Sequence, residues 1–258
     1  MSPTRRLMAL DLGTARTRSL ALGGRAVADR PSVIVRRTSA SGGPEVVWPI
    51  RHGMVADPGA CLRLVRMVLQ DTCLYDSRPL ERVLAGVPVA ASRSDRRAVQ
   101  AAVAEIAGCE VRLVEEPLAA AVGVGLDVID PRPRLLLDVG AGIVEAVAIE
   151  GGAVVEAVAL QLSATTGAGP AAYALEGVVD MTAGLLRRLP TASRPAARAR
   201  GLVVTGGGAH QELLLRRLRA ALRLPVSAAP QPQHATVRGL MRLCLRPALA
   251  GDLGRRAR

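Results

Sequence analysis

The sequence predicts an α/β protein built from two related lobes. Residues 7–27 and 134–154 align without a gap at an offset of 127 residues, so that Asp11 falls on Asp138. Each segment reads as an apolar strand, an Asp-x-Gly turn and a second strand, which is typical of a β-hairpin. A period this long indicates a repeat of whole lobes, because solenoid repeats are far shorter. Elsewhere the pattern alternates between strands and helices, which favours layers of helices packed on sheets.

Local signals place the elements between and after the hairpins. Asp57 and Pro58 predict the start of a helix that carries apolar residues at helical spacing. Residues 190–200 are rich in Pro, Ser and Ala, and we expect a surface connection with little internal structure there. The other expected elements are strands at 80–87, 111–114 and 202–205, and helices at 94–107, 175–189, 211–222 and 234–245.

Composition and charge limit the partners of the chain. Its 258 residues suffice for two lobes of ordinary size, and all 34 basic residues are arginines, with a net charge of +12. The arginines are scattered over the expected helix faces, and only Arg255, Arg256 and Arg258 form a cluster. Scattered charge is typical of a solvated surface, so we do not expect a nucleic-acid partner. Contact of the basic tail with an anionic membrane stays open.

Cysteine usage and hydropathy indicate a protein of the cell interior. The four cysteines form no C-x-x-C pair, and we expect small buried side chains in a reducing compartment. We find no apolar run of about 18 residues and no signal peptide. The expected location is therefore the cytoplasm, with peripheral contact at the inner face of the membrane left open.

Three glycine turns that follow strands are the candidate site for binding phosphate and Mg²⁺. They are Asp11–Thr14, Asp138–Gly142 and Thr205–Ala209. Glycine lets backbone N–H groups approach an anion, and successive amides form a concavity of phosphate size. An Asp at the end of each first strand can hold the water shell of Mg²⁺. The alternative is that the glycines serve only the turns themselves.

Several segments, in order along most of the chain, resemble the MreB/Mbl group of bacterial actins within the actin/Hsp70/sugar-kinase superfamily. Residues 10–17 are similar to the first phosphate loop of that group, 114–121 to its connecting segment, and 205–208 to its adenosine loop. Further similar segments are 30–34, 49–57, 87–88 and 96–98.

The resemblance implies a duplicated actin-like ATPase fold of the ribonuclease H-like type, with ATP and Mg²⁺ as cofactors. By the same resemblance, Glu116 helps to orient the attacking water, and Asp11 and Asp138 hold the metal through water. A charge at a helix N-terminus is the alternative for Glu116. The expected nucleotide-binding residues are Asp11, Gly13, Thr14, Ala15, Arg16, Asp138, Gly140, Ala141, Gly142, Gly206, Gly207 and Gly208.

Departures from the family pattern predict weak nucleotide binding. Ile143 and Val144 stand where the second phosphate loop of MreB carries two threonines. A hydrogen bond to a charged phosphate contributes about 1.5–3 kcal/mol, so losing two would weaken binding by about two to four powers of ten. The upper subdomain of the second lobe is expected to be missing and that of the first to be shortened. The predicted domains are 1–133, 134–249 and a basic tail at 250–258.

These features predict an MreB-like cytoskeletal protein of cell shape or cell-wall morphogenesis. Its ATP binding would be weak or vestigial, and its role accessory to an MreB/Mbl-type filament or to the cell-wall synthesis machinery. Two alternatives remain open: a compact Hsp70-like ATPase or chaperone module, and a nucleotide-free scaffold that docks on a complete filament. We also expect His52, His210 and His234 to be surface residues and Trp48 to be a packing residue.

Overall fold

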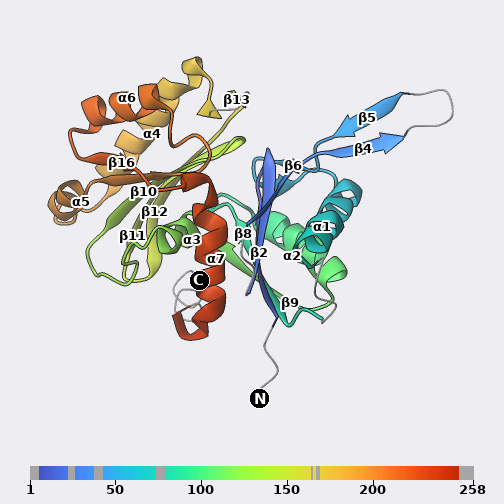
Figure 1. Ribbon diagram of the computed structural model, residues 1–258. Coiled ribbons are helices and arrows are strands. Elements are labelled where there is room, and N and C mark those ends of the chain that lie inside the picture. The colour runs from blue at the N-terminus through green and yellow to red at the C-terminus, as the bar shows by residue number, and fades with distance from the viewer. Residues whose placement is uncertain are drawn as a thin grey trace.

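The computed structural model describes residues 6–22, 27–37, 43–73, 79–163, 165–166 and 169–249. The basic tail predicted at 250–258 lies outside these residues. Two α/β lobes stand side by side, one built from the first half of the chain and the other mainly from the second half (Figure 1).

The first lobe is built on a five-stranded sheet with the order β3-β2-β1-β8-β9. Strands β1 to β3 run antiparallel, whereas β1, β8 and β9 are parallel. The strands are β1 (Leu7–Leu12), β2 (Arg16–Ala21), β3 (Ala28–Pro31), β8 (Arg82–Val87) and β9 (Glu110–Glu115).

The second lobe repeats this topology in the order β12-β11-β10-β15-β16. The registers also repeat: Asp11 pairs with Arg18 in the first hairpin, and Asp138 pairs with Glu145 in the second. The predicted duplication is therefore confirmed at the level of strand order and register. The strands are β10 (Arg134–Val139), β11 (Ile143–Glu150), β12 (Ala153–Gln161), β15 (Leu202–Thr205) and β16 (Val226–Ala228).

Each sheet packs one face against helices of its own lobe. Helices α1 (Pro58–Cys73) and α2 (Arg93–Ala107) bury apolar side chains against the first sheet. Helices α4 (Leu175–Arg188), α5 (Arg194–Arg200) and α6 (Glu212–Leu222) do the same on the second sheet. These bounds confirm the helices expected from the apolar periodicity, apart from α5.

Two helices join the lobes through a third apolar core. Helix α3 (Glu116–Gly123) is buried along its length and packs on α7 (Ala235–Leu245) between the two sheets (Figure 1). The helix backbones touch, because a Cβ on Gly239 would lie 1.7 Å from the carbonyl oxygen of Ala119. Helix α7 also packs on β1 and β8, so the chain crosses back onto the first sheet near its end.

Short hairpins lie where upper subdomains were expected to be reduced. In the first lobe β4 (Ile34–Arg37) and β5 (Pro44–Val47) form an arm, followed by β6 (Ile50–Arg51) and β7 (Met54–Val55). The second lobe carries β13 (Thr165–Thr166), β14 (Gly169–Pro170) and the short 3-10 helix η1 (Ala172–Ala174), and η2 (Pro232–His234) precedes α7.

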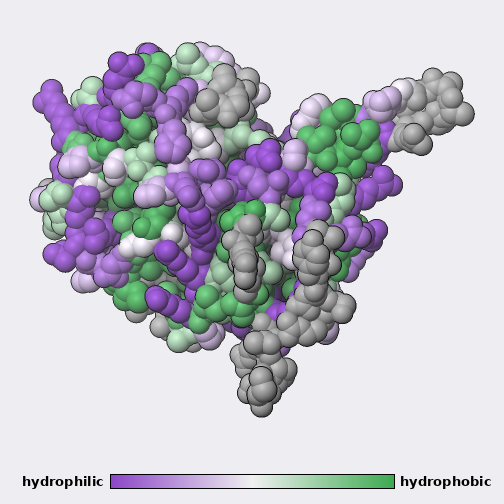
Figure 2. Space-filling view, viewed as in Figure 1, coloured by the Kyte–Doolittle hydropathy of each residue, from purple (hydrophilic) through white to green (hydrophobic). Residues whose placement is uncertain are grey.

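The surface of the arm is partly apolar. Figure 2 shows hydrophobic surface over the arm at the upper right of the molecule. Val35 and Val46 pair across β4 and β5 and are exposed. Trp48, directly after β5, is 52% exposed, so the expectation that it is a packing residue is wrong.

The segment 190–200 is not the irregular connection that its composition indicated. Helix α5 occupies most of it, with Pro195 in the first turn, where a missing N–H costs nothing. Alanine and arginine are strong helix formers, and Ala197 is fully buried in the core of the second lobe. Tertiary packing of this one face fixes a helix that is too short to be stable alone.

Two of the four cysteines agree with the expectation of small buried side chains, and the side chain of Cys73 lies outside the described part of the chain. Cys61 and Cys244 are buried, and burial raises the pKa of each thiol to about 11. Cys109 is half-buried. In the described ranges no helix combines the length and the apolar character needed to cross a membrane.

Candidate functional site

The two Asp-x-Gly turns face each other across a cleft between the lobes. The cleft has a volume of about 250 Å³. Every residue predicted to bind nucleotide lines it, and so does Glu116. The lining residues are Asp11, Gly13, Thr14, Ala15, Arg16, Arg18, Gly53, Glu116, Asp138, Gly140, Ala141, Gly142, Ile143, Gly206, Gly207, Gly208, Gln233 and Thr236.

The glycines of the two hairpin turns are required by the turns. A Cβ on Gly13 would lie 2.6 Å from the carbonyl oxygen of Arg16, and a Cβ on Gly140 would lie 2.6 Å from that of Ile143. The same clash at equivalent positions shows that both lobes use the same tight turn. These two glycines are thus explained by backbone geometry whatever the cleft binds.

In the third glycine turn, at residues 205–209, one glycine is required by close packing and another has open space around it. Gly206 has a φ of 83°, and a Cβ there would meet both the backbone of Val139 and the carboxylate of Asp138. At Gly207 nothing lies within 4 Å of an added Cβ. The turn therefore packs tightly against β10 on one side and leaves an open edge beside the cleft.

The two phosphate-loop candidates are in direct contact. A Cβ on Gly142 would lie 2.4 Å from Oγ1 of Thr14 in the other lobe. His52 Nδ1 lies 2.6 Å from the carbonyl oxygen of Gly142, and the Gly53 amide donates to Thr14 Oγ1 at 3.0 Å. His52 thus lies at the junction of the lobes, which the expectation of a surface residue had missed.

Four buried carboxyl groups surround the cleft. Asp11, Glu116, Asp138 and Glu145 are each less than 10% exposed. Burial raises the pKa of Asp11 to about 7; Arg18 acts against this rise and Asp138 adds to it. Burial also raises the pKa of Asp138, whereas the hydroxyl of Thr205, which donates to Oδ1 at 3.1 Å, lowers it. The charged forms therefore need a cation or a hydrogen-bond donor.

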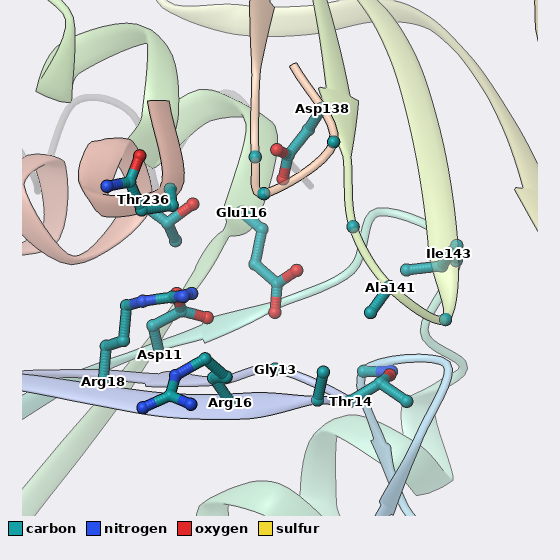
Figure 3. A pocket seen from close by; sticks show the side chains of 18 residues that line it. Asp11, Gly13, Thr14, Arg16, Arg18, Glu116, Asp138, Ala141, Ile143 and Thr236 are labelled. Carbon is teal, nitrogen blue, oxygen red and sulfur yellow. The ribbon is translucent and has the colours of Figure 1, made fainter. Parts of the chain in front are cut away.

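Glu116 begins α3 and points into the space between the two turns (Figure 3). Burial raises its pKa well above the ordinary value, and the charges of Asp11, Glu145 and Asp138 raise it further. Its Oε1 is buried without a hydrogen-bond partner in the described residues. A buried oxygen with no partner is costly, so this geometry fits a group that receives a ligand, a water or a proton.

The acidic residues fit a hydrated divalent cation. Asp11 and Asp138 approach the cleft from opposite lobes, and Glu116 adds the unpartnered oxygen. Within the described ranges no three Asp, Glu, His or Cys side chains are placed to hold a metal ion directly. Mg²⁺ keeps several waters, and its binding through water by Asp11 and Asp138 stays a prediction.

Only one of the two missing hydroxyls concerns the cleft. Ile143 lines the cleft, whereas Val144 is fully buried in the core of the second lobe. Neighbouring residues of a strand point to opposite faces, so the two positions cannot both face a phosphate. The estimate of two lost hydrogen bonds is therefore reduced to one.

Sequence reasoning missed several residues of the site. Arg18 follows the first turn on β2, and its place opposite Asp11 repeats the place of Glu145 opposite Asp138. The offset of 127 residues that aligns the hairpins also aligns these two residues, so the signal was present. Gln233, in η2, and Thr236, at the start of α7, also line the cleft, and no local motif marks them.

Glu145 was also missed, and it connects the lobes. It is 2% exposed, and its Oε1 accepts a hydrogen bond from the amide of Ala90, which follows β8 in the first lobe, at 3.2 Å. Its Oε2 has no partner among the described residues. Burial raises its pKa to about 8, the Ala90 amide acts against this rise, and Asp138 adds to it.

The two lobes have the same strand order, and their equivalent Asp-x-Gly turns face each other across a cleft. This arrangement is that of the actin-like ATPase fold. The chain superposes on MreB5 of Spiroplasma citri bound to ADP with a TM-score of 0.82 and 18% identity, covering 96% of this chain and 98% of that one. It also superposes on a chain of the MamK double helical filament with a TM-score of 0.76 and 16% identity, covering 94% of this chain and 99% of that one.

The sequence narrows this class to one family. A family model described as MreB/Mbl protein matches residues 38–167, about half of the chain. The cell shape-determining protein MreB of Escherichia coli (strain K12) is 29% identical over 164 residues, which cover 55% of this chain and 47% of that protein. The chain belongs to the MreB/Mbl family. It spans about half the length of the curated relatives that it matches.

Proposed function

We propose that this chain is an MreB-like cytoskeletal protein of cell-shape or cell-wall morphogenesis that binds an adenine nucleotide between its lobes. The observation that carries the proposal is the pair of equivalent Asp-x-Gly turns facing each other with Glu116 between them. Membership of the MreB/Mbl family supports the cytoskeletal part, and the ADP in the superposed MreB5 structure supports the nucleotide part.

Nucleotide binding is weak in this proposal. The cleft volume of about 250 Å³ lies just below the usual range of roughly 300–1,000 Å³ for ligand pockets. Ile143 offers no donor to a phosphate. Asp11 and Asp138 would hold Mg²⁺ through water. Glu116 would face the attacking water, but without the hydroxyl that Ile143 replaces it would add little to a slow hydrolysis.

Calorimetry with ATP and ADP in the presence of Mg²⁺ tests this part. We expect dissociation constants weaker than micromolar, because at least one phosphate contact is absent. Micromolar or tighter affinity would show that the cleft is intact. No heat at millimolar nucleotide would remove the nucleotide from the proposal and leave a nucleotide-free scaffold.

The proposed role is accessory to a filament rather than an autonomous filament. Among the described residues between β12 and α4, the second lobe carries the short elements β13, β14 and η1. A head-to-tail contact propagates only if both complementary surfaces are present, and stable interfaces usually bury on the order of 1,200–2,000 Å². The proposed partners are an MreB/Mbl-type filament or the cell-wall synthesis machinery, in the cytoplasm at the inner face of the membrane.

Sedimentation and electron microscopy test the accessory role. The purified protein should stay in the supernatant at concentrations at which a full-length MreB pellets with ATP, and it should enter the pellet when that MreB is present. Albumin in place of this protein controls for trapping in the pellet. Long, regular protofilaments of this protein alone would contradict the accessory role and make it an autonomous filament former.

A further inference from the structure

Arg18 breaks the symmetry of the two lobes at the cleft. In the duplicated hairpins Arg18 and Glu145 occupy equivalent positions, opposite Asp11 and Asp138 respectively. The second lobe therefore places an acid where the first lobe places a cation. The Arg18 side chain is 13% exposed and lines the cleft beside Asp11 (Figure 3).

One nitrogen of the Arg18 guanidinium is hydrogen-bonded, and the other two remain available as donors. Nε donates to Oδ2 of Asp29 at 3.2 Å. Nη1 and Nη2 donate to no residue in the part of the chain that the structure describes. The guanidinium lies beside Asp11 (Figure 3), and its charge lowers the pKa of Asp11 and of Asp138, one from each lobe.

The neighbouring cation is engaged elsewhere. Arg16 also lines the cleft, but its side chain is 43% exposed and is bonded to Asp29 through both Nε, at 2.6 Å, and Nη2, at 3.1 Å. Among the described lining residues Arg16 and Arg18 are the arginines. Arg18 is therefore the cation whose donors are free to meet an anion in the cleft.

We propose that Arg18 is the phosphate-binding cation of this cleft, with Nη1 and Nη2 donating to the phosphate chain of a nucleotide. The proposal rests on the proposed nucleotide function. A guanidinium presents parallel donors that match phosphate oxygens, and a partly desolvated site strengthens such a charge-assisted pair. The Arg18 guanidinium thus neutralises part of the phosphate charge that Mg²⁺ would otherwise neutralise.

Two consequences follow for binding. Nucleotide binding should depend less on Mg²⁺ than in a site of carboxylates and backbone amides alone, because a permanent cation remains when the metal is removed. Inorganic tripolyphosphate should also bind, because the contact is to phosphate and needs no base. If Arg18 serves only as a counter-ion of Asp11 and Asp138, neither ligand will depend on it.

The test is calorimetry with ATP and with sodium tripolyphosphate, each in Mg²⁺ and in EDTA. Wild type is compared with Arg18→Gln and with a control, Arg30→Gln, which removes an arginine from the adjacent strand β3 where it pairs with Asp71. We expect wild type to lose less than about tenfold in affinity in EDTA. Arg18→Gln should weaken both ligands by about ten- to one-hundredfold, and most in EDTA, while Arg30→Gln binds as wild type does.

The outcomes separate this inference from the proposed function. If wild type binds neither ligand under any condition, the nucleotide function fails and the inference fails with it. If wild type binds ATP and Arg18→Gln binds it equally well with and without Mg²⁺, only the inference fails. Should Arg18→Gln not fold, Arg18→Lys keeps the charge but loses the paired donors. We expect Arg18→Lys to bind tripolyphosphate severalfold more weakly than wild type, and unchanged affinity would overturn the proposal.

Discussion

Replacing Glu145 with glutamine should make the protein more stable at neutral pH, and the size of the gain should depend on pH. Glu145 is 2% exposed, and its environment raises its pKa from 4.5 to about 8. Between these values the folded protein keeps the proton and the unfolded chain releases it. The unfolded state then binds fewer protons, so the free energy of unfolding falls as pH rises.

The magnitude follows from the pKa shift. Over the interval from pH 4.5 to 8 this one group lowers the free energy of unfolding by up to about 1.4 kcal/mol per pH unit. From pH 5 to pH 7 the loss amounts to about 2.5 kcal/mol. Glutamine does not titrate, and its Oε1 can still accept the hydrogen bond from Ala90. The variant should thus gain about 2.5 kcal/mol over wild type between these two pH values.

Urea unfolding at pH 5 and pH 7 measures this difference. Asp11, Glu116 and Asp138 also make the free energy of unfolding depend on pH, but they do so in both wild type and Glu145→Gln. Their contributions therefore largely cancel when the variant is compared with wild type. Glu105→Gln, on the exposed side of α2, is the matched control for the exchange of a carboxyl for an amide. A stability difference between Glu145→Gln and wild type that stays constant within about 0.5 kcal/mol at both pH values would refute the reasoning.

The remaining predictions concern packing and chemistry. Ile143→Thr should raise ATP affinity by up to about tenfold in calorimetry, because residue 143 lines the cleft. Val144→Thr should leave ATP affinity unchanged and lower stability by about 1–3 kcal/mol, because its hydroxyl would be buried in the core. A higher ATP affinity of Val144→Thr than of Ile143→Thr would contradict the assignment of the two residues to opposite faces of the strand. Gly239→Ala should lower stability by at least about 1–3 kcal/mol in urea unfolding, because its Cβ would meet a backbone carbonyl of α3. Gly184→Ala in α4 should be neutral or stabilising, because its Cβ would meet the side chain of Arg187 at an ordinary 3.8 Å. Equal effects of the two substitutions would refute the close helix contact. Glu116→Ala should change Mg²⁺-dependent ATP turnover little, because Ile143 has no hydroxyl that could position the attacking water together with Glu116. A fall in turnover on the order of 10²–10⁴-fold would show that Glu116 is a working catalytic residue.

The sequence by itself determined the duplication and most of the elements. The hairpin at Asp11 and the hairpin at Asp138 are local signals, since each depends on strand patterning and on glycines that fit one tight turn. Helices α1, α4, α6 and α7 were found because their apolar residues recur at helical spacing. The family resemblance supplied the order of the motifs and thereby placed Glu116 at the same site as the two turns.

Only the tertiary structure decided which side chains face the cleft. Periodicity alone gave no reason to separate Ile143 from Val144, and the sheet assigns one to the cleft and the other to the core. The pairing of Glu145 with Ala90 joins residues 55 positions apart in different lobes, so no local pattern contains it. The same holds for α5, because the burial of Ala197 that stabilises this short helix is a tertiary contact.

The charge balance of the cleft was also decided by tertiary packing. Asp11, Glu116 and Asp138 are ordinary acidic residues in the sequence, and their pKa values are raised because packing of the two lobes removes water. At Asp11 and Glu116, nearby like charges raise the pKa further. Arg18 lies among scattered arginines in the sequence, but the register of β1 and β2 directs it to this cluster. Burial and mutual distance are properties of the folded chain, and that is why sequence reasoning named three of the four acidic residues of the site but neither Glu145 nor the cation Arg18.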